Sequence, residues 1–224
     1  MRVVIAGGHG KIALHLQRLL RGRDDTPVAL IRNPDHTDEV AAAGGEPVVF
    51  DLESGGIAEL AEHIENADAV VFAAGAGPGS GIPRKDTVDR AGAALLAEAA
   101  QRAGVRRYLL VGAMGVKPDD PEWTPPEDVG EVFAAYLHAK VASERDLMGR
   151  DLDATVLRPG KLTDDEPAGR VRLARSEIER GEVSRTDVAA VLVALLDEPG
   201  TAGLTLELVG GDQPIAVAVD GVLS

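Results

Sequence analysis

The stretch IAGGHGKIA, residues 5–13, places three glycines between a short apolar run and a segment with helical periodicity. The run Arg2–Ala6 predicts a buried strand, and Lys11–Leu20 predicts an amphipathic helix that begins directly after the glycines. The glycines therefore lie at a turn from a strand into a helix.

Glycine at such a turn leaves the main-chain N–H groups bare at the positive end of the helix dipole, where a phosphate binds well. Gly7, Gly10 and Ala13 follow one another at intervals of three, which lets the helix pack closely on the strand. A tight turn without a ligand is the alternative. The position of the motif, after the first strand of a chain of βα units, favours a dinucleotide.

Short apolar runs alternate with helical patterns along the chain. The valine-rich runs are typical of strands buried on both faces, and their alternation with helices predicts a parallel sheet. We expect an α/β, Rossmann-type doubly wound parallel sheet with helices on both faces. The further strands are expected at Pro27–Ile31, Pro47–Phe50, Ala69–Phe72, Tyr108–Val111 and Ala154–Leu157, and the further helices at 35–43, 57–64, 87–103 and 131–148.

The alternation weakens after Arg158. A strand at Arg170–Ala174, a helix capped by Thr186 or Asp187 and running to Leu196, and a strand at Leu204–Val209 are expected there. We interpret residues 1–224 as one NAD(P)-binding domain, in which 159–224 form a small appendage on the substrate side.

Composition excludes several kinds of protein. The 224 residues contain no cysteine, which excludes disulfides, thiolate catalysis and cysteine–metal sites, and no metal site is predicted. The net charge of −14 repels phosphate backbones, so nucleic acid is not an expected partner. No apolar run is long enough for a membrane span and the start lacks a signal peptide, so a cytoplasmic protein is expected, as a monomer or a homodimer.

The residues after the second expected strand bear on the choice of cofactor. NAD-preferring sites carry an acidic residue there, which binds the ribose 2′-hydroxyl, whereas this chain has Arg32. A guanidinium can hold a 2′-phosphate through two charge-assisted hydrogen bonds, which favours NADP(H) over NAD(H). An exposed surface arginine is the alternative.

The ends of the third and fourth expected strands supply further candidates. Asp51 and Leu52 follow the third strand, where an acidic residue can reach the adenine edge or can serve only as a helix cap or solvated carboxylate. The fourth strand ends in Ala73, Ala74 and Gly75, whose small side chains let a flat ligand lie against the backbone.

Tyr136 and Lys140 are spaced i and i+4 in the expected helix at 131–148 and so share one face. An ammonium near a phenol lowers the pKa of the phenol, which makes the tyrosine a usable general acid and base. We predict this pair as catalytic, the lysine also binding the cofactor, with an ordinary Tyr–Lys contact as the alternative.

These motifs, together with LIRNP at 30–34, RPG at 158–160 and SRTDVA at 184–189, make the chain resemble the short-chain dehydrogenase/reductase superfamily. Within it, the resemblance is to the atypical NAD(P)H-binding members grouped with NmrA-like proteins and biliverdin/flavin reductases. It implies that the glycine turn binds the diphosphate, that Arg32 binds the 2′-phosphate, and that Pro159 and Gly160 lie near the nicotinamide. The full set of expected cofactor-binding residues is Gly7, Gly8, His9, Gly10, Lys11, Ile12, Arg32, Asn33, Asp51, Leu52, Ala73, Ala74, Gly75, Lys140, Pro159 and Gly160.

The chain departs from the superfamily pattern after the fifth strand. A serine or threonine that polarises the substrate carbonyl is usual there, but this chain has Gly112 and Ala113. Losing a positioned donor of this kind typically costs ~10²-fold or more in rate. The only tryptophan, Trp123, lies in the proline-rich loop at 117–130, where it either stacks on a planar substrate or anchors the loop.

Three functions follow from these features. The leading hypothesis is an NADP(H)-dependent oxidoreductase that reduces a small carbonyl, quinone or flavin-like acceptor, with Tyr136 as the proton donor. The alternative is a non-catalytic NADP(H)-binding redox sensor, which the missing hydroxyl favours and the retained Tyr–Lys pair opposes. A sugar-nucleotide epimerase is disfavoured, because such enzymes usually carry a larger carboxyl-terminal substrate domain.

Overall fold

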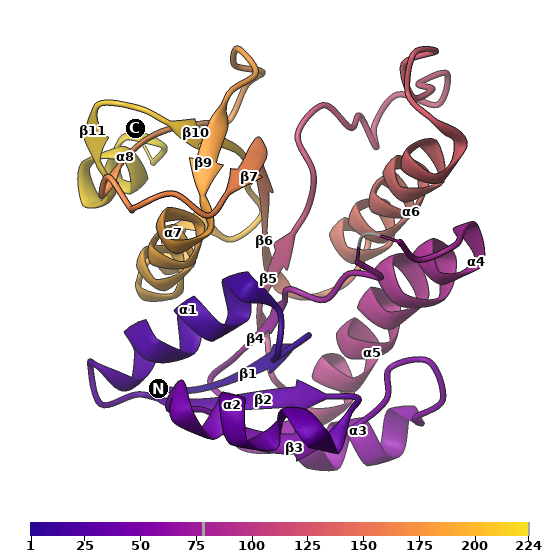
Figure 1. Ribbon diagram of the computed structural model, residues 1–224, viewed down its shortest axis with the longest axis vertical. Helices are drawn as coiled ribbons and strands as arrows, with labels where there is room; N and C mark the ends of the chain where they lie inside the picture. Colours follow the sequence, from indigo (N-terminus) through magenta and orange to yellow (C-terminus); the bar gives the residue numbers. More distant parts are fainter. Residues whose placement is uncertain (78, 224) are drawn as a thin grey trace.

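The computed structural model describes residues 1–77 and 79–223 of the chain. In this part nine strands form one sheet in the order β11-β8-β10-β6-β5-β4-β1-β2-β3 (Figure 1). Strand β1 pairs in parallel with both β2 and β4, so the order reverses beside it, which is where doubly wound sheets bind their ligands. The strands of this sheet are β1 (Arg2–Ala6), β2 (Thr26–Ile31), β3 (Glu46–Val49), β4 (Ala69–Phe72), β5 (Arg107–Val111), β6 (Asp153–Pro159), β8 (Arg170–Ala174), β10 (Thr205–Gly210) and β11 (Gln213–Pro214).

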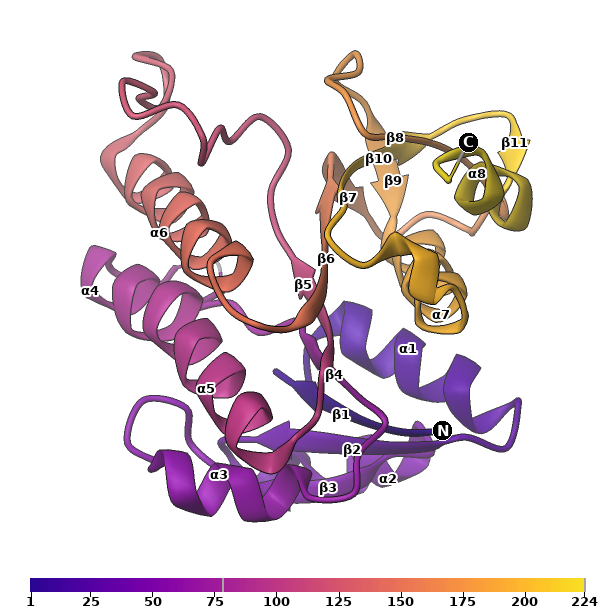
Figure 2. The same cartoon turned by 180° about the vertical axis from the view of Figure 1, so that it is seen from behind.

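Helices cover both faces of the sheet. Figures 1 and 2 show α1 and α7 together on one side and α5 and α6 on the other. The α-helices are α1 (Lys11–Arg21), α2 (Thr37–Ala42), α3 (Ile57–Ile64), α4 (Ile82–Arg84), α5 (Ala93–Ala103), α6 (Glu131–Met148), α7 (Arg185–Asp197) and α8 (Ile215–Gly221). A π-helical segment, η2 (Lys85–Gly92), joins α4 to α5, and two short 3₁₀ turns lie at Pro34–His36 and Pro199–Thr201.

Alternate residues of each central strand pack into the two halves of the core. In β1, Val3 and Ile5 join the cluster beneath α1 and α7, while Val4 and Ala6 join the cluster beneath α3 and α5. All four side chains are fully buried, as expected of strands covered on both faces. The predicted doubly wound sheet with helices on both faces is confirmed.

In the carboxyl-terminal part the strand expected at Arg170–Ala174 is present as β8, and other elements there were not predicted from the sequence. Strands β8 and β11 are antiparallel to their neighbours, and a separate parallel pair is formed by β7 (Lys161–Thr163) and β9 (Glu182–Ser184). The strands β7, β9 and β11 have two or three residues each, too few to produce a recognisable alternation.

The start of α7 also differs from the expectation. The N-cap is Ser184, whose Oγ accepts a hydrogen bond from Asp187 N at 3.0 Å, and not Thr186 or Asp187. The Asp187 carboxylate instead accepts the N–H groups of Ala168 and Gly169 at 3.0 and 2.9 Å. It therefore fixes the loop before β8.

None of the helices in the described part of the chain combines the length and the apolar character that crossing a membrane requires.

Candidate functional site

The glycine turn between β1 and α1 is built for close backbone contacts. Gly7 has φ +79°, and a Cβ placed on it would stand 2.5 Å from Ala74 Cα. A Cβ on Gly8 would stand 2.5 Å from the Ala29 side chain, so both positions require glycine. Gly10 is the N-cap of α1, and no side chain in the described part of the chain caps this end. The first N–H groups of α1 are therefore available to an anion.

A cleft of about 480 Å³ opens beside this turn. Most of the expected cofactor residues line it: Gly7, Gly8, His9, Gly10, Arg32, Asn33, Asp51, Leu52, Ala73, Ala74 and Gly75. Lys11 and Ile12 do not. Lys11 is exposed and pairs with Asp164 at 2.5 Å, because the first turn of α1 directs it away from this cleft. Ile12 lines a second cleft.

Two of the lining side chains have local structural partners. Asn33 Oδ1 accepts a hydrogen bond from Asp35 N at 3.1 Å, and Asp51 Oδ1 accepts one from Glu53 N at 3.0 Å. The Asp51 carboxylate thus stabilises its own loop while it lines the cleft, and a contact with the adenine edge stays a prediction.

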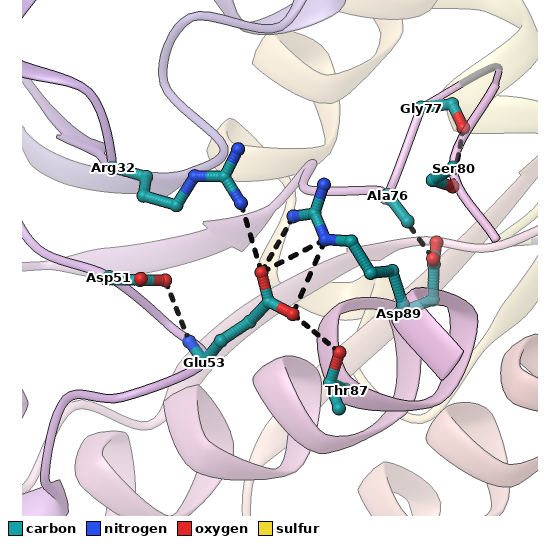
Figure 3. Close-up of polar contacts among 9 residues, drawn as sticks. Arg32, Asp51, Glu53, Ala76, Gly77, Ser80, Thr87 and Asp89 are labelled. Carbon is teal, nitrogen blue, oxygen red and sulfur yellow. Dashed lines mark hydrogen bonds and ion pairs between the residues drawn. The ribbon is translucent and has the colours of Figure 1, made fainter. Parts of the chain in front are cut away.

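Arg32 lies at the rim of this cleft with about half of its side chain exposed, and its Nη1 is 3.1 Å from Glu53 Oε2. Arg84, which the sequence pattern did not indicate, lines the same cleft and pairs with the same carboxylate at 2.7 Å. The only sequence signal for Arg84 is its position directly after the glycine-rich segment that follows β4. Figure 3 shows Arg32 and Asp51 beside Glu53.

The second cleft has a volume of about 650 Å³ and shares Ala73, Ala74 and Gly75 with the first. The two clefts therefore meet along the segment after β4. The second cleft is lined by the expected catalytic pair, Tyr136 and Lys140. It is also lined by Pro159 and Gly160, which are expected near the nicotinamide, and by Gly112 and Ala113, which follow β5.

Lys140 is buried and surrounded by polar partners. Its Nζ donates a hydrogen bond to Val111 O at 2.9 Å and lies 3.7 Å from Asp89 Oδ1. Asp89, which no sequence motif indicated, has no exposed surface and lines the second cleft. Its Oδ2 accepts a hydrogen bond from Ala76 N at 3.1 Å, while its Oδ1 has no hydrogen-bond partner among the described residues. The sequence signal that could have pointed to Asp89 is a carboxylate within the alanine-rich helix expected at 87–103.

The predicted effect of Lys140 on the Tyr136 phenol is wrong for this structure. Burial raises the pKa of Tyr136 above its usual value, and the carboxylates of Asp89 and Glu144 raise it further. Lys140 Nζ lies 5.6 Å from the centre of the tyrosine ring and is directed to other partners. Burial lowers the pKa of Lys140, whereas the nearby Asp89 carboxylate raises it. The phenol is therefore protonated at neutral pH.

A buried carboxylate explains why no serine stands at position 112. A Cβ on Gly112 would clash with Glu144 Oε1 and would stand 3.1 Å from Val156 Cγ1. Glu144 is held there by Arg158, whose Nη2 donates to Glu144 Oε2 at 2.6 Å. The space that a serine side chain would need is already filled.

Trp123 packs against a small cluster formed by Ala113, Val116, Leu137 and Val141. It is not among the residues that line either cleft. Of the two roles open from the sequence, the structure favours the anchor of the loop. No three His, Asp or Glu side chains of residues 1–77 and 79–223 are grouped in a way that could hold a metal ion.

A turn with bare N–H groups, beside the point where the strand order reverses, is the arrangement of a dinucleotide site. A family model described as NAD(P)H-binding matches residues 7–199. The chain belongs to this NAD(P)H-binding family. The expected NAD(P)H-binding character of the family is thereby confirmed.

The family member YhfK of Bacillus subtilis, named an uncharacterized sugar epimerase, is 34% identical over 220 residues, which are 98% of this chain and 99% of YhfK. A putative NAD-dependent epimerase/dehydratase from Bacillus halodurans has a similar structure, with a TM-score of 0.87 and 34% identity over 99% of this chain and 100% of that one. The oxidoreductase ylbE from Lactococcus lactis gives a TM-score of 0.85 at 25% identity, over 100% of this chain and 97% of that one.

Proposed function

We propose that the chain is an NADP(H)-dependent reductase of a small carbonyl, quinone or flavin-like acceptor. The observation that carries this proposal is the meeting of two clefts along Ala73–Gly75, one at the glycine turn and one holding Tyr136 and Lys140. The cofactor, when bound, supplies the hydride. The chain supplies the binding surfaces and the proton.

The residues of the first cleft fit a dinucleotide. The bare N–H groups at the start of α1 suit the diphosphate, and a Cβ on Gly10 would stand only 3.1 Å from Gly7 O. Arg32 supports a preference for NADP(H), because a guanidinium at the end of β2 suits a 2′-phosphate. Arg32→Ala is expected to weaken NADPH binding far more than NADH binding, and an equal loss for both would refute this role.

The state of Tyr136 suits a proton donor. The phenol is protonated at neutral pH and lines the second cleft, so it can give a proton to an oxygen that becomes negative during reduction. Lys140 lines the same cleft beside it, held by Val111 O and Asp89. We therefore assign Tyr136 as the acid and Lys140 as a residue that helps to position it.

The test is oxidation of NADPH in the presence of quinones, flavins and aldehydes, followed by the absorbance of the reduced nicotinamide. Tyr136→Phe is expected to lower turnover of at least one acceptor by about 10² to 10⁴-fold. The chain has only two tyrosines, so Tyr108→Phe is a matched control. Tyr108 is fully buried and donates to Ala93 O, so its loss is expected to cost about 1 kcal/mol of stability and no turnover.

A specific observation favours the redox sensor as a second candidate. Gly112 and Ala113 leave the second cleft without the hydroxyl that usually polarises a carbonyl. Tight NADPH binding without turnover of any acceptor would support the sensor over the reductase. Because two similar proteins are named as epimerases, the panel includes sugar nucleotides, and their interconversion without net NADPH oxidation would contradict the reductase.

A further inference from the structure

The carboxylate of Glu53 is held by three groups at the rim of the first cleft. Arg84 donates to it from Nε at 3.1 Å and from Nη2 at 2.7 Å, and Arg32 donates from Nη1 at 3.1 Å. Thr87 Oγ1 completes the set at 2.6 Å from Glu53 Oε1. Figure 3 shows Thr87 and Arg32 on either side of the Glu53 carboxylate.

The donors come from two segments that lie far apart in the chain and surround a single anion. Arg32 follows β2, whereas Arg84 and Thr87 lie three residues apart where α4 runs into η2. Two guanidinium groups with a hydroxyl form the donor set that proteins use for a phosphate monoester, which offers three oxygens and about two negative charges. Glu53 supplies only two oxygens and one charge.

The cluster is also open to exchange with a ligand. The side chains of Arg32, Arg84 and Glu53 are 54%, 37% and 23% exposed, and all three line the cleft. The hydrogen bonds from Arg84 and Thr87 lower the pKa of Glu53, so its carboxylate is charged at neutral pH. A phosphate that reached these arginines would meet this negative charge within the same cluster.

We propose that Arg32 and Arg84 together form the binding site for the cofactor 2′-phosphate, and that Glu53 is an internal anion that competes for it. This rests on the NADP(H) binding proposed above. In the free protein Glu53 holds both arginines in place, and the 2′-phosphate takes over their donors when NADPH binds. NADH, which has no 2′-phosphate, leaves the Glu53 pairs intact. Glu53 therefore sets the ratio between the two affinities.

The test measures the dissociation constants of NADPH and NADH by calorimetry at low salt. Glu53→Gln keeps the size of the side chain and removes its charge, so we expect NADPH to bind about tenfold more tightly and NADH to change less than about twofold. Arg84→Ala is expected to weaken NADPH about tenfold or more and to leave NADH within about threefold. The fragments 2′,5′-ADP and 5′-ADP are expected to repeat both differences, because they differ only in the 2′-phosphate.

Matched controls separate the cluster from general charge effects. Glu59→Gln changes an exposed glutamate on α3, and Arg90→Ala removes an arginine of η2 that pairs with Asp86 outside the cleft. Both should leave the ratio of the two affinities unchanged. If Arg84→Ala does not fold, Arg84→Gln takes its place.

The outcomes also separate this inference from the proposed function. An unchanged or lower preference for NADPH in Glu53→Gln, or an equal loss of NADPH and NADH in Arg84→Ala, would overturn the inference alone. Wild-type protein that binds neither dinucleotide would overturn the proposed function as well.

Discussion

The clash between position 112 and Glu144 predicts a large loss of stability for Gly112→Ala. The added methyl group would overlap Glu144 Oε1, and it would stand 3.1 Å from Val156 Cγ1 and 3.2 Å from Arg158 Cγ. Glu144 is only 1% exposed, and Arg158 holds its carboxylate through Nε at 2.9 Å and Nη2 at 2.6 Å. The new methyl group must therefore displace either the carboxylate or the backbone.

The size of the effect follows from these two routes. Overpacking of a tight core typically costs about 1–3 kcal/mol, and breaking a buried ion pair costs about 3–5 kcal/mol. We expect Gly112→Ala to lower the free energy of unfolding by about 3 kcal/mol, which for a chain of this length lowers Tm by about 6–12 °C.

The assay is urea unfolding followed by circular dichroism at neutral pH. Gly56→Ala is the control, because a Cβ on Gly56 meets nothing within 4 Å, and its expected cost is at most about 1 kcal/mol. In the double variant Gly112→Ala/Glu144→Ala the clash is gone. Its loss of stability should therefore be smaller than the sum of the losses in the two single variants, by about 1 kcal/mol or more. A loss for Gly112→Ala no larger than that of the control, or strict additivity, would refute the reasoning.

Three further predictions concern the second cleft. Ala113→Ser adds a hydroxyl to a residue that lines the cleft, so reduction of an aldehyde acceptor by NADPH should accelerate about tenfold or more. Unchanged turnover of the folded variant would contradict this. Because the pKa of Tyr136 is raised, its phenol stays protonated as pH increases. Acceptor reduction should therefore show no loss from ionisation of Tyr136 below about pH 10. A decline in rate centred near pH 7–8 would speak against Tyr136 as the acid. Trp123→Ala should lower the free energy of unfolding in urea by about 2 kcal/mol, because the half-buried ring packs against its cluster beside the cleft. The KM for the acceptor should change less than about threefold. A larger KM effect with unchanged stability would contradict the role of Trp123 as the anchor of the loop.

The sequence predicted the central part of the fold because its signals are local. Runs such as Ala69–Phe72 are short, apolar and followed by small residues, so each strand and its carboxyl end can be located without knowing its neighbours. The glycine turn is equally local, since Gly7 and Gly8 must be glycine to fit against Ala74 and Ala29.

The interactions that the sequence did not reveal join residues far apart in the chain. Glu53 meets Arg32 and Arg84 across 21 and 31 positions, and only the order of the strands brings them together. The conflict between Gly112 and Glu144 is of the same kind, so the missing serine was visible in the sequence while its cause was not. The phenol pKa was mispredicted because the spacing of Tyr136 and Lys140 says nothing about Val111 O, to which the ammonium donates.

The π-helical segment η2 serves both clefts at once. Figure 3 shows Thr87 directed to Glu53 and Asp89 directed to Ala76, although the two residues are only two positions apart. Positions two apart on a helix point to nearly opposite sides, so η2 can reach contacts on both sides of the segment after β4. Deleting Val88, which lies between Thr87 and Asp89, would turn one side chain relative to the other by roughly a quarter of a turn. The hydrogen bond from Thr87 to Glu53 and the one from Ala76 to Asp89 could then no longer form together.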